Sequence, residues 1–130
     1  MFWKKKTSLD EIFVLENQHG ERIEIPVILD AATAIPRYNK AEAILENARI
    51  AIARNPNSQE AVDSLGRAAI AQLAVVFGDE GVAEIYKFHH ENAEAMLRSC
   101  YPYIKKRVLP VLKAGSKARL RELKKTTRRL

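Results

Sequence analysis

The N-terminal part of the chain shows a short apolar run followed by an alternation of apolar and polar residues. Residues 12–15 are β-branched, aromatic or aliphatic, residues 17–20 are polar or glycine, and every second residue of 23–27 is apolar. A period of two is typical of a strand with one buried face, and Gly20 can adopt the positive φ of a tight turn. The pattern predicts a β-hairpin over residues 12–28, which must pack on another layer because an isolated hairpin is marginal in water.

From Tyr38 onward the apolar residues recur every three to four positions, which is the spacing of amphipathic helices. The Asn-Pro-Asn sequence at 55–57 ends the first helix, and Asn57 is expected to cap the second one. Ile44 and Val62 are expected to lie on the buried stripes of these two helices.

Two further helices are expected in the remainder of the chain. Gly78 stands where a residue with positive φ would end a helix, and the acidic pair after it suits the positive end of the next. Residues 92–112 also show helical spacing, but a proline such as Pro102 costs about 3 kcal/mol inside a helix. A kink or a restart is therefore expected at residues 99–101. The predicted fold is mainly α, with an N-terminal β-hairpin, a compact bundle of about four helices and a basic C-terminal tail.

A chain of 130 residues has the size of one domain. We divide it into a basic N-terminal arm (1–11), a single domain (12–113) with its helices at 38–113, and a basic tail (114–130). The single cysteine, Cys100, excludes an intrachain disulfide, and its place on an apolar stripe predicts a buried core residue. No apolar run has the length of a signal peptide or a membrane span. We therefore expect a cytoplasmic protein with no membrane partner.

Positive charge is concentrated towards the C-terminal end. Residues 98–130 hold twelve Lys or Arg against Glu122 alone, although the net charge of the whole chain is only +6. Such asymmetry often marks a segment that meets a polyanion or an acidic protein surface. Nucleic-acid binding is one interpretation, without the aromatic residues that base stacking needs after Tyr103, and a solvated tail is the other. The candidate basic residues of the tail are Lys113, Lys117, Arg119, Arg121, Lys124, Lys125, Arg128 and Arg129.

Residues with catalytic or metal-binding chemistry are sparse. His90 and Glu94 are four positions apart and could share a helix face, but a metal site needs three or four ligands. Cys100 shows no positioned base, and the chain contains neither a glycine-rich phosphate loop nor a nucleophile elbow. We expect a protein that is not an enzyme, with no catalytic residue, no metal and no cofactor.

The sequence Ala-Val-Val-Phe-Gly-Asp-Glu-Gly-Val-Ala-Glu-Ile-Tyr at residues 74–86 resembles the middle of tail assembly chaperones from long-tailed bacteriophages. In these small helical proteins an apolar helix often ends in Phe-Gly, and an acidic pair and a helix with an apolar-x-x-Ile-aromatic pattern follow. A polar stretch (89–92) and a further apolar helix (93–112) continue the similarity, which covers about residues 41–113. The resemblance implies a chaperone in the bacterial host cytoplasm that binds the tape measure protein and keeps it soluble during tail assembly.

A protein that holds a long helical partner needs a groove for amphipathic helices. The apolar residues of the last two predicted helices exceed what one buried face requires, so some are expected to be exposed or covered by a second copy in a homo-oligomer. The alternative is that all of them belong to the core. Tyrosine and methionine suit adaptable surfaces. The expected partner-binding residues are Ile85, Tyr86, Phe88, Met96, Leu97, Tyr101 and Tyr103.

Overall fold

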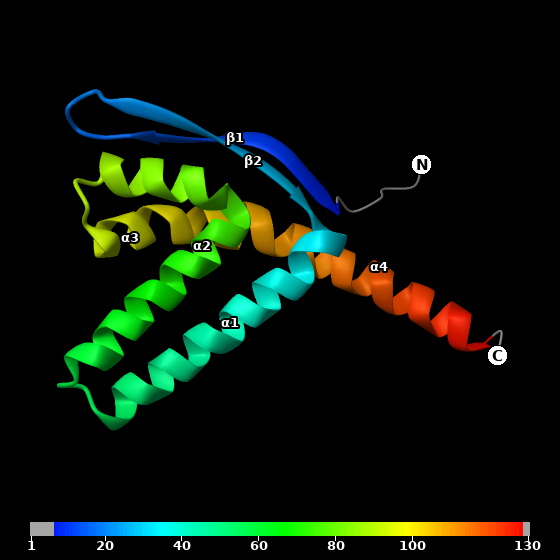
Figure 1. Cartoon of the computed structure of the whole chain (residues 1–130). Helices are drawn as coiled ribbons and strands as arrows, with labels where there is room; N and C mark the ends of the chain where they lie inside the picture. The colour runs from blue at the N-terminus through cyan, green and yellow to red at the C-terminus, as the bar shows by residue number, and fades with distance from the viewer. Residues whose placement is uncertain (1–6, 129–130) are drawn as a thin grey trace.

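The protein is described here by a computed structural model in which residues 7–128 are placed. The sequence predicted a mainly α chain with an N-terminal β-hairpin, and the structure confirms this (Figure 1). Residues 1–6 of the predicted arm and Arg129 of the predicted tail lie outside the described residues. The elements are β1 (Ser8–Glu16), β2 (Arg22–Asp30), α1 (Ala31–Arg54), α2 (Gln59–Phe88), α3 (Ala93–Tyr103), the π-helical segment η1 (Ile104–Val108) and α4 (Leu109–Arg128).

The hairpin is longer at both ends than the predicted range of 12–28. β1 and β2 pair antiparallel from Glu16 and Arg22 at the turn to Ser8 and Asp30 at the open end. The pairing extends one step further, because the Ala31 amide donates to the Thr7 carbonyl over 2.8 Å. Part of the predicted basic arm is therefore a strand.

The turn and the proline both fit the antiparallel ladder. The Asn17 side chain accepts hydrogen bonds from the amides of His19 and Glu21, each over 3.0 Å, and so fixes the turn. Pro26 lies opposite Ile12, and the alternation of the ladder makes this a pair without hydrogen bonds. Its missing N–H thus faces the open edge of β2 and costs no bond to β1.

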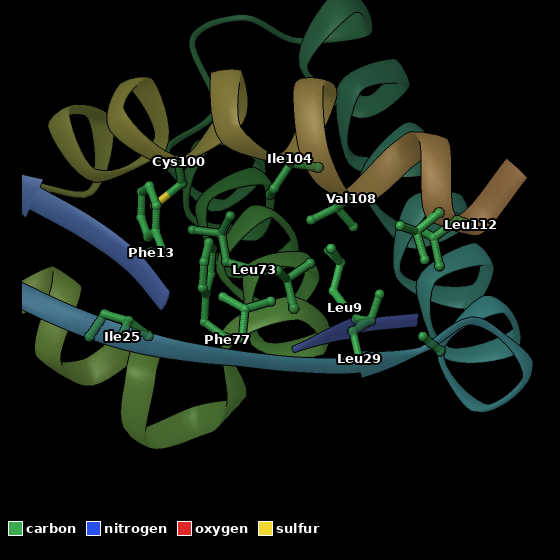
Figure 2. Close-up of a cluster of buried hydrophobic side chains, with 14 of the residues drawn as sticks. Leu9, Phe13, Ile25, Leu29, Leu73, Phe77, Cys100, Ile104, Val108 and Leu112 are labelled. Carbon is green, nitrogen blue, oxygen red and sulfur yellow. The ribbon is translucent and has the colours of Figure 1, made fainter. Parts of the chain in front are cut away.

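The inward face of the hairpin covers a core formed by α2, α3, η1 and the start of α4 (Figure 2). The Phe13 ring packs against Phe77, with centroids 5.2 Å apart, and against Tyr103, with centroids 4.5 Å apart. Burying an apolar side chain of this size contributes about 1.5–3 kcal/mol. The buried inward residues of the two strands are Leu9, Phe13, Ile25, Val27 and Leu29.

The outer parts of α1 and α2 pack against each other. α1 and the first part of α2 run side by side and project away from the hairpin (Figure 1), with Leu45 of α1 packed in a small cluster with Ala68 and Ala69. Ile44 and Val62 were expected to be buried but are exposed, because two paired helices bury only the faces that meet.

Both helices begin at other residues than the sequence predicted. α1 starts at Ala31 and not at residue 38, with Pro36 in its second turn, where the missing donor removes one intrahelical bond. α2 is capped by Ser58, whose hydroxyl accepts from the Ala61 amide over 3.2 Å; the prediction of Asn57 as the cap is wrong.

A sharp bend at Gly78 divides α2, as expected. Gly78 has φ 74° and ψ 165°, and helical geometry resumes directly after it. The bend turns the second half of α2 back beneath β2 (Figure 1), where Val82 and Ile85 join the core. By length and composition α2 could cross a membrane, and 33% of its apolar window is buried in the structure. The core helix of a protein passes the same test of length and composition, and Leu73 of α2 is fully buried.

α3, η1 and α4 form one continuous helical path, so the described residues contain three long helices, where about four were expected. Of the kink or restart expected at residues 99–101, the restart does not occur, because α3 runs through these residues and Pro102 lies inside it. A π turn follows, in which the Leu109 amide donates to the Ile104 carbonyl five residues back. This wider turn lies next to Pro110, where the ladder lacks a donor, and so accommodates the proline.

Candidate partner-binding surfaces

The predicted partner-binding residues do not form one surface. Ile85 and Met96 have no exposed area at all, so they cannot contact a partner as predicted. The reason is the layering: the hairpin lies over the second half of α2, which in turn packs against α3 (Figure 1). Tyr101 is exposed. The remaining four are half-buried: Tyr86, Phe88, Leu97 and Tyr103.

Tyr103, the last residue of α3, packs against β1. Its ring lies in the aromatic group with Phe13, and burial, with the Glu11 carboxylate adding to it, raises the pKa of Tyr103 to about 12. Glu11 in turn accepts from Arg107 over 2.9 Å. The Tyr103 hydroxyl is buried. The side chain therefore belongs to the packing between β1 and α3 and does not form part of an open surface.

An apolar hollow lined by two of the predicted residues, the half-buried Tyr86 and the buried Met96, lies inside the bend of α2. It has a volume of about 360 Å³ and is flanked by Arg67 and Asp79. We call it the bend groove. Both halves of α2 and the start of α3 contribute to its lining: Ile70, Ala71, Ala74, Val82, Ala83, Tyr86 and Met96.

The bend groove follows from the composition of α2. Alanines at positions 71, 74 and 83 leave space that longer side chains would fill, and the outward side of this apolar helix faces the groove because Leu73 and Val76 face the core. An apolar hollow between helices can accept side chains of an amphipathic helix. The sequence analysis identified Tyr86 but missed Ile70; the all-round apolar character of this segment was the available signal.

A polar cluster lies where α1 meets α2 and α3. Gln72 is a buried polar side chain and donates to the Glu42 carboxylate. Arg49 lies 3.6 Å from the same carboxylate. Burial raises the pKa of Tyr38 and of Tyr101, with the Glu42 charge acting in the same direction on both. The cluster ties α1 to α2 and leaves no paired acid and base facing an open cleft.

His89 and Ser99 are in contact. His89 Nδ1 lies 2.9 Å from the Ile85 carbonyl, and Nε2 lies 2.7 Å from Ser99 Oγ. Because a carbonyl oxygen can only accept, neutral His89 donates from Nδ1, and its Nε2 accepts from the Ser99 hydroxyl. The Ala95 carbonyl lies 3.1 Å from the same hydroxyl, and the contact joins the C-terminal end of α2 to α3. In the part of the chain that is described, no three His, Cys, Asp or Glu side chains could hold a metal ion.

Cys100 is a core residue, as predicted, and should be chemically inert. It is fully buried, and desolvation raises the pKa of its thiol to about 12. Because the thiolate is the reactive form, we expect iodoacetamide to alkylate native protein at pH 8 at least a hundredfold more slowly than protein in 8 M urea, as followed by mass spectrometry. Equal rates in the two conditions would contradict this position.

The predicted basic tail is an extension of α4 that leads away from the rest of the molecule (Figure 1). The side chains of Arg119 and Arg128 are not described. Leu120 and Leu123 lie on the same segment with exposed fractions of 53% and 56%, and the sequence analysis did not identify them. The basic residues found exposed are Lys113, Lys117, Arg121, Lys124 and Lys125.

The outward face of the hairpin is a second exposed apolar surface that the sequence analysis missed. Ile28 is 77% exposed and Ile12 is 56% exposed, with Val14 and Pro26 exposed beside them. The sequence contained a signal for this surface. Residues 12–15 are all apolar, and successive side chains of a strand point to opposite faces, so some of them must face outward.

Three comparisons with known proteins add no relative. A scan against protein-family models, a search of curated proteins and a search of solved structures each found no match.

Proposed function

We propose that this chain is a non-enzymatic tail assembly chaperone that binds helical segments of a tape measure protein and keeps them soluble. The observation that carries the proposal is the bend groove, an apolar hollow built largely from the segment 74–86 that resembles the chaperone family. A tape measure is a long helical chain with exposed apolar stripes before assembly, and its holder needs an apolar groove of this kind.

The bend groove suits loose and repeated binding. Its alanines let a partner helix approach closely, and Tyr86 offers an amphipathic ring to varied side chains. Its polar members, Arg67 and Asp79, lie on opposite sides of the bend in α2. With few polar groups to fix a register, many segments of a long partner fit equally well. Binding alone performs this role, and no bond is made or broken.

The test is co-expression with a phage tape measure protein. We expect wild-type protein to raise the soluble fraction of the tape measure severalfold. Ala71→Arg and Ala83→Arg should abolish this effect, because both alanines are exposed and line the bend groove, and a long charged side chain fills it. Ala53→Arg is the matched control, since Ala53 is exposed at the far end of α1 and does not line the groove.

The controls separate binding from folding. All three variants should keep the circular dichroism spectrum and the melting temperature of the wild type, because each site is on the surface. A tape measure that is equally soluble with and without this chain would overturn the proposal, and so would full activity of both groove variants.

A further inference from the structure

Two exposed surfaces have no role in the bend groove. The first is the outward face of the hairpin. Its cross-strand pairs run in the order Ser8 with Asp30, Asp10 with Ile28, Ile12 with Pro26, Val14 with Glu24, and Glu16 with Arg22. The centre of the face is therefore apolar and acidic residues lie towards both ends. Arg22 offsets part of the charge at the turn, where it bonds both Glu16 and Glu24.

The second surface is α4 beyond Gly115. Leu120 and Leu123 are three positions apart and so lie side by side on the helix. Lys117 precedes Leu120 by three positions and Lys124 follows it by four, which places a lysine on the same face at each end of the leucine pair. This surface has an apolar centre and basic ends.

The two surfaces match in charge order and in length. One is acidic, apolar and acidic, and the other is basic, apolar and basic. Glu24 pairs with Val14, so Asp10 and Glu24 are separated by about 13 Å along the strands. Lys117 and Lys124 are separated by about 11 Å along a helix. A two-stranded sheet with an uncovered apolar face also gains stability when a helix covers it.

We propose that the outward face of the hairpin binds the basic end of α4 from a second copy of this chain. The same chain cannot supply it, because α4 continues directly from η1, which packs beneath the inward face, and leads away from the sheet (Figure 1). Each copy thus carries one donor helix and one acceptor face. Contacts of this heterologous kind join copies head to tail.

The inference does not rest on the proposed function. The acceptor face and the donor helix share no residue with the bend groove, so self-association and tape measure binding can fail separately. It does explain why the chain carries exposed isoleucines on a sheet and exposed leucines on a projecting helix, since exposed apolar surface of this kind is an aggregation hazard.

The experiment is sedimentation equilibrium of the full chain, purified after nuclease treatment, in 50 mM salt. We expect the wild-type mass to rise with concentration above the 14.7 kDa of one chain and to fall back at 0.5 M salt as the charges are screened. Ile12→Lys with Ile28→Lys places like charges against α4, and Leu120→Gln with Leu123→Gln removes the apolar part of the donor. Each double variant should weaken association at least tenfold, while Ile44→Gln on α1, an equally exposed position, should not.

Mixing the two double variants gives the sharpest readout. The hairpin variant keeps an intact donor helix and the α4 variant keeps an intact acceptor face, so their mixture should form a 1:1 complex of about two chains although neither associates alone. Circular dichroism spectra equal to that of the wild type show that the variants fold.

Four outcomes would overturn the inference. The first is a wild-type chain that stays at 14.7 kDa up to several hundred micromolar. The second is a mixture that fails to pair. The third is association that nuclease treatment removes, because nucleic acid is then the partner of α4. The fourth is association that survives the Leu120 and Leu123 changes but is lost when residues 1–6 are deleted, because the N-terminal arm is then the occupant.

Discussion

Gly78→Ala is expected to lower the free energy of unfolding by about 2–3 kcal/mol, the largest effect of any exposed position in the chain. The backbone at Gly78, with φ 74° and ψ 165°, lies in a region that only glycine adopts readily. A Cβ at this position would meet nothing within 4 Å, so the whole cost comes from the backbone and not from a clash. The chain can avoid this cost only by straightening α2, which would remove Val82 and Ile85 from the core beneath the hairpin.

Thermal and urea unfolding followed by circular dichroism measure this effect. A loss of 2 kcal/mol should lower the melting temperature by about 8 °C in a chain of this size. Gly66→Ala is the matched control, because Gly66 is within the regular part of α2 and a Cβ there also meets nothing within 4 Å. That change should stabilise the protein by about 0.5–1 kcal/mol through helix propensity. A Gly78→Ala protein as stable as wild type would show that the bend is not fixed by this residue.

The bend at Gly78 was predictable because its signals are local. A glycine after an apolar helix and two acidic residues before the next are read from four consecutive positions. The direction of the chain after the bend was not predictable in this way. It depends on β2, some fifty residues earlier in the chain, which receives the second half of α2.

The full length of β1 could not be predicted, because the pattern of apolar and polar residues along this strand depends on contacts with distant parts of the chain. Glu11 is inward-facing and partly buried, where a strand pattern requires an apolar residue, because Arg107 pairs with it from ninety-six residues away. Ile12 and Val14 are outward-facing, where the pattern requires polar residues. With both faces mixed, the alternation fails over residues 8–16 and only the apolar run of 12–15 stands out.

The candidate partner-binding surface was also predictable only in part. Of the residues expected on the partner-binding surface, Ile85 and Met96 lie in the core and Tyr101 is exposed, while the most exposed apolar residues lie on the hairpin and on α4. The sequence could not reveal that the hairpin lies over the second half of α2. Groove residues such as Ala71 and Ala83 carry no chemical signal, because an alanine contributes to a groove only through what it leaves empty. Pro102 misled a local rule, since α3 continues through it and the wider π turn forms only at η1, next to Pro110.

Gly115→Ala should lower the free energy of unfolding by about 2 kcal/mol, although helix propensity alone predicts a gain of about 1 kcal/mol. Gly115 lies where α4 crosses the first turn of α1, and a Cβ there would come within 2.3 Å of the Ala31 Cβ and 3.3 Å of Ile35 Cδ1. Both Cβ atoms are attached to helix backbones and cannot rotate away, so the helices must separate, and overpacking of this kind costs about 1–3 kcal/mol. The sign of the measured change therefore tells which effect is larger.

The Ala31→Gly variant provides the decisive comparison. Removing this Cβ takes away the atom that the new methyl group would strike, so Gly115→Ala should destabilise a chain carrying Ala31→Gly far less than it destabilises wild type. Urea unfolding of the wild type, both single variants and the double variant forms a complete cycle, in which we expect a coupling of about 1–2 kcal/mol. Additive single effects would contradict direct contact at this crossing. Because the crossing sets the angle at which α4 leaves the molecule, Gly115→Ala should also weaken self-association, and Ala31→Gly should restore it in the double variant.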